Sequence, residues 1–178
     1  IAGYWEGKTC QEYAASLMPQ AAKDAQSGGV FTVGNYFFNG VGHICVDYAK
    51  VLAKGFKGII EEALGEARKL DITRPADHKK LQFLNAVVIA CNAAIKFAQR
   101  FAKEARRLAQ ETTDPRRKKE LEEIAKNCEW VPANPARSFY EALQSFWFVQ
   151  LIIQLESNGH SISPMRFDQY MYPYLKQD

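Results

Sequence analysis

The chain has 178 residues, of which 47% are hydrophobic and 24% charged, and its formal net charge is +3. These values are those of an ordinary globular protein, with enough length for one sizeable core that forms a domain or part of a larger one. The densest basic run, residues 116–119, is followed at once by three glutamates, which favours a solvated helix over a nucleic-acid-binding patch.

The first half of the chain is predicted to be mainly helical. Residues 11–26 are rich in alanine and are followed by Ser-Gly-Gly, which predicts one helix that stops there. From Asp47 to Leu70 apolar residues recur at helical spacing, although two glycines weaken the middle of this second helix. The longest helix is predicted from about Asp77 to Glu111, because its apolar residues form a stripe with steps of three and four.

The second half contains a helix of unusual composition. Asp114-Pro115 first predicts a helix start, with Asp as N-cap and Pro at the first helical position. Ser138 and Glu141 then have the spacing of a capping box, and the helix that they open, to about Ser157, is apolar all round. Such a helix is buried in a large protein or crosses a membrane. Its uninterrupted apolar stretches are too short for a bilayer, so we expect it to be the most buried element.

Two stretches break the helical pattern and could line a cavity. Residues 28–43 contain five of the eleven glycines, include a possible short strand at 30–33 and end in His43. Glycine permits the close approaches that a tight cavity needs, but on spacing alone ordinary connecting turns are the favoured interpretation. Residues 157–164 carry His160 and Ser161, which could point into an interior cavity or cap backbone carbonyls.

The cysteines and the chain ends indicate what kind of protein this is. The four cysteines are far apart and form no C-x-x-C pair, so the sequence does not support a zinc or iron–sulfur site, and no metal is expected. Four cysteines do not make a disulfide scaffold in a chain of this size, which favours reduced thiols in a cytosolic protein. The first eight residues do not resemble a signal peptide, and both ends are expected to be cuts.

Three blocks of the sequence resemble recurrent segments of the glycyl radical enzymes. Their sequences begin N-G-V-G-H-I-C-V-D-Y-A-K at residue 39, W-V-P-A-N-P-A-R-S-F-Y-E-A-L at residue 130 and S-N-G-H-S-I-S-P-M-R-F-D at residue 157. They follow the order and the approximate spacing of that family, over nearly all of the chain. Within the family, V-F-T-V-G-N-Y-F-F-N-G-V-G-H at residues 30–43 is most similar to the B12-independent glycerol and 1,2-propanediol dehydratases.

The resemblance implies a fold and a place in a longer protein. Residues 1–178 are expected to be a single, mainly α segment of the N-terminal pyruvate formate-lyase-like domain, the helical part of a ten-stranded, helix-wrapped α/β barrel. The family's radical cysteine lies in a Gly-Cys-x-Glu type block, and none of the four cysteines here has that context. That block and the C-terminal glycyl radical domain are absent from this sequence. The isolated segment is therefore expected to be inactive, and the full-length protein to be a carbon–oxygen lyase.

The resemblance also implies a radical mechanism for dehydrating glycerol or 1,2-propanediol to an aldehyde and water. A radical-SAM activating enzyme installs the glycyl radical on a residue outside this chain, so no cofactor is expected to be bound here. By this resemblance His43 is the catalytic group that assists the departing C2 hydroxyl, and His43, His160 and Ser161 bind the diol. Side chains that share one small ligand are expected to lie within about 6–8 Å of one another.

Other functions remain open at this point. The full-length protein could be another glycyl radical lyase, acting on choline or hydroxyproline or resembling pyruvate formate-lyase, and the segment could be a non-catalytic helical scaffold or interaction fragment. The resemblance further implies a homodimer that works in anaerobic metabolism, without nucleic-acid or membrane partners. We expect a cytoplasmic location, whether free or within a bacterial microcompartment.

Overall fold

The computed structural model describes residues 2–32, 42–157 and 161–177. Within these ranges the chain forms helices and one isolated β-bridge, with no longer strand, which confirms the mainly α class for this part. The helices are α1 (Ala2–Trp5), α2 (Cys10–Leu17), α3 (Gln20–Ser27), α4 (Tyr48–Ala67), α5 (Pro75–Glu111), α6 (Pro115–Trp130), α7 (Phe139–Ser157) and α8 (Phe167–Leu175).

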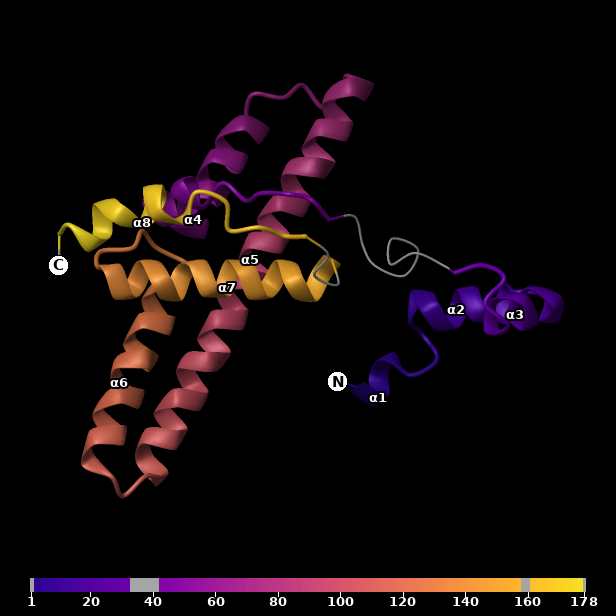
Figure 1. Ribbon diagram of the computed structural model, residues 1–178. Coiled ribbons are helices and arrows are strands. Elements are labelled where there is room, and N and C mark those ends of the chain that lie inside the picture. Colours follow the sequence, from indigo (N-terminus) through magenta and orange to yellow (C-terminus); the bar gives the residue numbers. More distant parts are fainter. Residues whose placement is uncertain (1, 33–41, 158–160, 178) are drawn as a thin grey trace.

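The helices α4, α6 and α7 pack against α5, and α8 packs against α7 (Figure 1). The helices α5 and α6 form a long antiparallel hairpin, α4 lies along the first half of α5, and α7 crosses the hairpin and contacts α8. By length and composition alone α5 could also span a bilayer. Its contacts with α4, α6 and α7 account for its apolar stripe, as predicted from the spacing of its residues.

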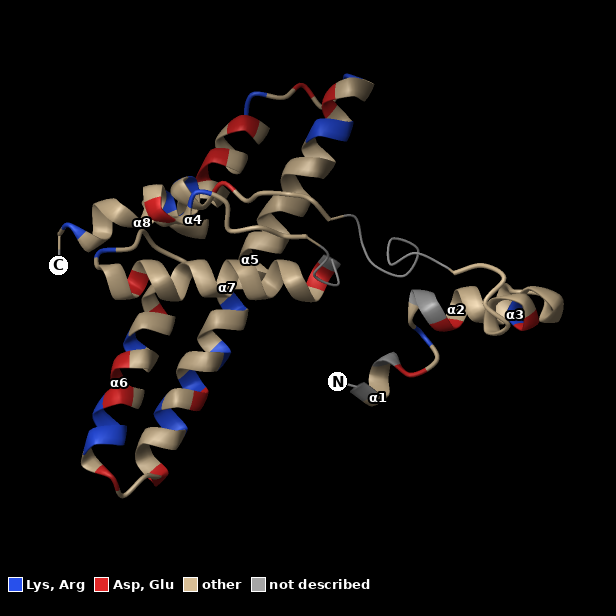
Figure 2. Ribbon diagram, viewed as in Figure 1, with Lys and Arg blue, Asp and Glu red and all other residues tan. Residues whose placement is uncertain are grey.

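Charge is distributed unevenly over these helices (Figure 2). The α5–α6 hairpin carries acidic and basic residues side by side, whereas α7 is almost free of charge between its ends. Within the basic run at the start of α6, Arg117 Nη1 lies 2.9 Å from Glu120 Oε2. The predicted solvated helix with neighbouring opposite charges is therefore confirmed, and it begins with Asp114, whose side chain accepts from the Arg116 amide at 2.9 Å.

The N-terminal prediction was partly wrong. A single helix was expected over residues 11–26, but the structure has α2 and α3, separated at Met18 and Pro19. Proline has no N–H and disfavours helical geometry in the residue before it, and Met18 is extended, with φ −72° and ψ 126°. Residues 30–32 form no strand, so the strand considered at residues 30–33 is not found, although Val33 itself lies outside the described residues.

The helix α4 changes direction at Gly55, where the predicted weakness lies. Gly55 has φ 65° and ψ 170°, a combination open essentially to glycine alone. A Cβ atom at this position would lie 2.5 Å from both the Ala133 carbonyl oxygen and the Asn134 carbonyl carbon. The Phe56 amide donates to the Pro132 carbonyl at 2.8 Å. The glycine therefore allows α4 to contact the backbone of the α6–α7 connection directly.

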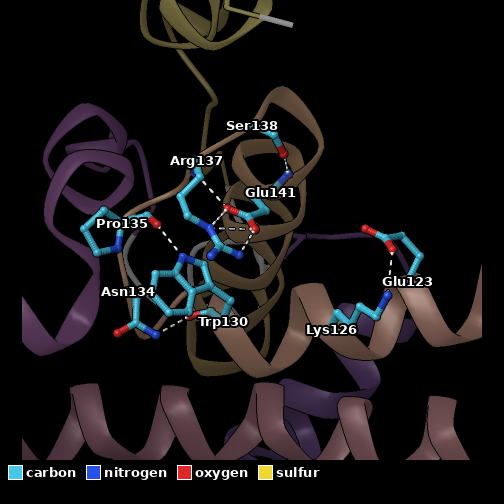
Figure 3. Close-up of polar contacts among 8 residues, drawn as sticks. All are labelled: Glu123, Lys126, Trp130, Asn134, Pro135, Arg137, Ser138 and Glu141. Atoms are coloured by element: carbon cyan, nitrogen blue, oxygen red, sulfur yellow. Dashed lines mark hydrogen bonds and ion pairs between the residues drawn. The ribbon is translucent and has the colours of Figure 1, made fainter.

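A cluster of side chains fixes the start of α7 (Figure 3). The Arg137 guanidinium lies over the Trp130 ring, 4.0 Å from its centroid, and its Nη2 lies 2.5 Å from Glu141 Oε1. The Glu141 amide donates to Ser138 Oγ at 3.2 Å, which is the first half of the predicted capping box. The second half differs, because the Glu141 carboxylate accepts from the Arg137 amide at 2.7 Å, one residue earlier than Ser138.

The predicted all-apolar helix is α7. Its residues Ala142, Ser145 and Phe148 are buried, and its exposed large side chains are mostly apolar, with Trp147 56% and Leu155 66% exposed. Within the described residues α7 therefore has no broad polar face in water. This composition is typical of a helix that more protein covers, and burial of α7 on every side stays a prediction.

Candidate functional site

The two helix-breaking stretches lie side by side, although most of the chain separates them. The His43 amide donates to the Ser161 carbonyl at 3.1 Å, and the Ser163 amide donates to the Ile44 carbonyl at 3.4 Å. Between these contacts Cys45 and Ser163 form a parallel β-bridge. Residues 43–45 and 161–163 are therefore two short segments that lie side by side and are joined by backbone hydrogen bonds.

Two of the three residues predicted to bind substrate are brought together in this way. The hydrogen bond between their backbones makes His43 and Ser161 direct neighbours, and both are exposed to solvent in this chain. His160, the third, lies outside the described residues. The binding and catalytic roles of these residues stay predictions.

An open hollow of about 540 Å³ lies over the paired segments. Its lining offers an imidazole, two hydroxyls, a thiol and apolar side chains, contributed by His43, Ile44, Cys45, Ser161, Ile162, Ser163, Pro164 and Met165. This volume lies in the usual range for small-molecule sites, roughly 300–1,000 Å³. Within the part of the chain that the structure describes, the lining includes no Lys or Arg, and no three His, Cys, Asp or Glu side chains are placed to hold a metal ion.

Backbone strain is concentrated in the same hollow. Among the described residues, the non-glycine residues with positive φ are His43 at 60°, Ser161 at 54° and Met165 at 53°. This left-handed conformation costs free energy in residues that carry a Cβ atom, and it persists only where the surrounding structure holds it. All three line the hollow, and strained residues of this kind cluster at functional sites.

Buried polar groups support the hollow from beneath. Gln150 of α7 donates from Nε2 to the Ile162 carbonyl at 3.1 Å, and its Oε1 accepts the hydroxyl hydrogen of Tyr48. Tyr48, the first residue of α4, is 1% exposed, and burial, with a smaller contribution from the nearby Cys45 thiol, raises its pKa to about 12. Tyr170 of α8 stacks on Tyr48 with 5.2 Å between ring centroids, and burial raises its pKa as well.

These supporting residues were not predicted from the sequence. The sequence did contain one indication of a supporting residue, Gln150. A polar residue in the middle of an all-apolar helix needs a hydrogen-bond partner when it is buried. Its partners, Tyr48 and the Ile162 carbonyl, lie on other elements, and Tyr48 is 102 positions away. Spacing along the helix could therefore not reveal them.

The family model and the most similar known proteins point to the same family. A family model described as "Pyruvate formate lyase-like" matches residues 1–178. The chain is 38% identical to the (2S)-3-sulfopropanediol dehydratase of Klebsiella oxytoca over 98% of its own length, and it covers 21% of that protein. It is 40% identical to the isethionate sulfite-lyase of Nitratidesulfovibrio vulgaris over its whole length, and it covers 23% of it. The chain thus spans about a fifth of the length of these relatives.

Solved structures agree with this result. The glycerol-bound B12-independent glycerol dehydratase of Clostridium butyricum matches 99% of the chain with 55% identity and a TM-score of 0.80, and the chain covers 22% of it. A structure on 1,2-propanediol dehydration in Roseburia inulinivorans matches 99% of the chain with 48% identity and a TM-score of 0.81, and the chain covers 21% of it. A family match over every residue, together with these likenesses, shows that the chain belongs to the pyruvate formate lyase-like family of glycyl radical enzymes.

Proposed function

We propose that this chain is one segment of a glycyl radical diol dehydratase, which converts glycerol or 1,2-propanediol to an aldehyde and water. The observation that carries the proposal is the pairing of His43 with Ser161 in the lining of the hollow. An imidazole and a hydroxyl on adjoining segments suit a small neutral molecule with two hydroxyl groups. Similarity to the glycerol and propanediol dehydratase structures, at 55% and 48% identity, points the same way.

The lining favours a neutral diol over the sulfonates named in the curated relatives. A sulfonate carries a full negative charge, which proteins usually bind with Arg or Lys through charge-assisted hydrogen bonds. Among the described residues, those that line the hollow include neither. Hydroxyls, in contrast, can be bound by an imidazole, serine hydroxyls and backbone groups. We therefore assign this part of the pocket to the diol hydroxyls.

The proposed chemistry depends on His43 as a proton donor. When the full-length protein carries its glycyl radical, that radical supplies the means to abstract hydrogen from C1 of the diol. Hydroxide is a poor leaving group, so the C2 oxygen needs a proton or a strong hydrogen bond as its bond to carbon breaks. His43 is proposed to supply it, while Ser161, with His160, holds the diol in place. The strained backbone at His43 and Ser161 supports a fixed, preorganised geometry.

The same proposal includes the surroundings of the segment. We propose that residues 1–178 form part of the N-terminal domain of a ten-stranded α/β barrel, with the radical cysteine block and the glycyl radical domain further along the full-length protein. The protein is proposed to be a cytoplasmic homodimer that a radical-SAM enzyme activates. The exposed apolar side chains of α7 are compatible with further protein packing on them.

The test uses the full-length protein, activated anaerobically with its activating enzyme and S-adenosylmethionine. We expect aldehyde from glycerol or 1,2-propanediol and none from isethionate. His43→Ala should leave the glycyl radical content intact and lower turnover by about 10²–10⁴-fold, the usual contribution of one general acid. His78→Ala, at an exposed position near the start of α5, is the matched control and should behave as wild type.

Two results would contradict the proposal. If the His43→Ala protein forms aldehyde at the wild-type rate with equal radical content, measured by electron paramagnetic resonance, His43 has no part in the reaction. If the wild-type protein cleaves a sulfonate and leaves both diols unchanged, the substrate class is wrong.

A further inference from the structure

We propose that Tyr48, Gln150 and Tyr170 are positioning residues, which hold segment 161–164 so that Ser161 stays in register with His43. This inference rests on the proposed function, because it concerns the same hollow. The three side chains come from α4, α7 and α8, and none of them lines the hollow. They act through the backbone of the segment and do not contact the substrate.

The segment is held from two sides. On one side the Ser161 carbonyl and the Ser163 amide bond to residues 43–44. On the other side the Ile162 carbonyl accepts from Gln150 Nε2 at 3.1 Å, and the Pro164 carbonyl accepts from the Tyr170 hydroxyl at 2.8 Å. The Ile162 carbonyl and the Ser163 amide belong to one trans peptide group, whose C=O and N–H point in opposite directions, so this group is held from both sides at once.

The hydrogen-bond chain has one possible direction. The Ile162 carbonyl can only accept, so the Gln150 amide must present its NH₂ group there and its oxygen to Tyr48. Tyr48 must then donate, which it can do as long as it is neutral. Burial raises the Tyr48 pKa to about 12, so the phenol keeps its hydrogen over the whole physiological range. The amide orientation is thereby fixed, and with it the position of Ile162.

The aromatic rings tie the same residues into the core. Tyr48 packs on Phe146 of α7 with 4.8 Å between ring centroids, and it stacks on Tyr170 of α8. Segment 43–45 leads into Tyr48 along the chain, and segment 161–164 is bonded to Gln150 and Tyr170. Both segments that line the hollow are therefore attached to the same packed group of side chains. A shift of this group would move His43 and Ser161 relative to each other. Misplacement of reacting groups by about 1 Å can cost about 10²-fold in rate.

The experiment replaces the polar groups and keeps the shapes. In the activated full-length protein, Gln150→Met removes both hydrogen bonds with an unbranched side chain of similar length, while Tyr48→Phe and Tyr170→Phe keep their rings. We expect Gln150→Met to lower kcat/KM for the diol by about 10–100-fold at equal glycyl radical content, with a change in KM as well as kcat. Tyr174→Phe, on the same helix as Tyr170 and packed in the core, is the matched control and should leave kcat/KM unchanged.

A double variant separates a hydrogen-bond chain from independent effects. If Tyr48 acts through Gln150, Tyr48→Phe combined with Gln150→Met should be no slower than Gln150→Met alone. Hydrogen exchange gives a readout that does not depend on turnover: the His43 and Ser163 amides should exchange at least about 10-fold faster in Gln150→Met, because the segment that they bond to is released.

The possible failures are distinguishable. If the wild type turns over a diol and Gln150→Met matches it in kcat/KM, or only melts at a lower temperature, the positioning role is refuted and the dehydratase function stands. If the wild type turns over no diol, the dehydratase proposal fails, and the exchange measurement decides on the positioning role by itself. Unchanged exchange at His43 and Ser163 would then overturn the inference.

Discussion

Replacing Gly55 by alanine tests how α4 is joined to the α6–α7 connection. The substitution places a Cβ atom 2.5 Å from the Ala133 carbonyl oxygen, and the neighbouring atoms are backbone, so no flexible side chain can move aside. The conformation at φ 65° and ψ 170° costs an L-residue about 1–3 kcal/mol. Relieving the clash by moving the connection away would also break hydrogen bonds.

Two backbone hydrogen bonds are at stake in that movement. The Phe56 and Lys57 amides donate to the Pro132 and Ala133 carbonyls at 2.8 and 2.9 Å. Each of these hydrogen bonds contributes about 0.5–1.5 kcal/mol net. Together with the backbone cost, we expect the free energy of unfolding to fall by about 2–6 kcal/mol. A loss of this size is a large part of the roughly 5–15 kcal/mol by which a domain is usually stable.

The assay is urea unfolding of the full-length protein followed by far-UV circular dichroism, with hydrogen exchange at the Phe56 and Lys57 amides. Gly65→Ala in the same helix is the matched control, because nothing lies within 4 Å of a Cβ atom there. Alanine is a better helix former than glycine, so this control should be more stable than wild type by about 0.5–1 kcal/mol. Equal stability of the Gly55→Ala variant and the wild type would refute the reasoning.

Two further predictions concern α6 and the start of α7. Arg137→Ala should lower the urea midpoint, because the Glu141 carboxylate, 7% exposed, loses its guanidinium partner and keeps only the amide of residue 137. Arg137→Lys should recover only part of this loss, since lysine lacks the planar group over Trp130. Equal midpoints for Arg137→Ala and wild type would contradict this. Burial raises the pKa of Cys128 from 9.0 to about 11 and that of Cys91 upward. The folded protein should therefore resist iodoacetamide at both thiols at pH 8, as measured by peptide mass spectrometry. The free energy of unfolding should be unaffected below pH 9.0 and should fall from there towards about pH 11, because only the unfolded Cys128 ionises freely in that window. Rapid labelling of folded Cys128 would show that it is not buried.

The helices were largely predictable because their signals are local. The start of α6 follows from Asp114-Pro115, and the apolar stripe of α5 follows from steps of three and four. The break between α2 and α3 was also encoded locally, by Pro19, but the alanine-rich composition on both sides favoured one continuous helix. At this break Pro19 outweighs the propensity, because it has no N–H to donate and disfavours helical geometry at Met18.

The candidate site was less predictable, since its contacts join distant parts of the chain. On spacing alone residues 28–43 were interpreted as ordinary connecting turns, and Ser161 either as a cavity-facing residue or as a cap of backbone carbonyls. Only the family resemblance linked His43 to Ser161. Their positive φ angles leave no signal in the sequence, because neither is a glycine. The glutamines of α7 were visible only as interruptions of an apolar helix, and what Gln150 bonds to depends on how α4 and α7 pack.

The pairing of residues 43–45 with 161–163 has a consequence for the order in which the nascent protein is assembled. Tyr48 and its partner Gln150 are separated by 102 positions. At about 5–20 residues per second of synthesis, the first wall leaves the ribosome roughly 5–20 s before the glutamine that completes its support. During that interval segment 43–45 is an open edge whose amides and carbonyls have no native acceptor or donor from segment 161–163. The hollow therefore cannot form until segment 161–163 has been synthesised, and segment 43–45 stays unpaired until then.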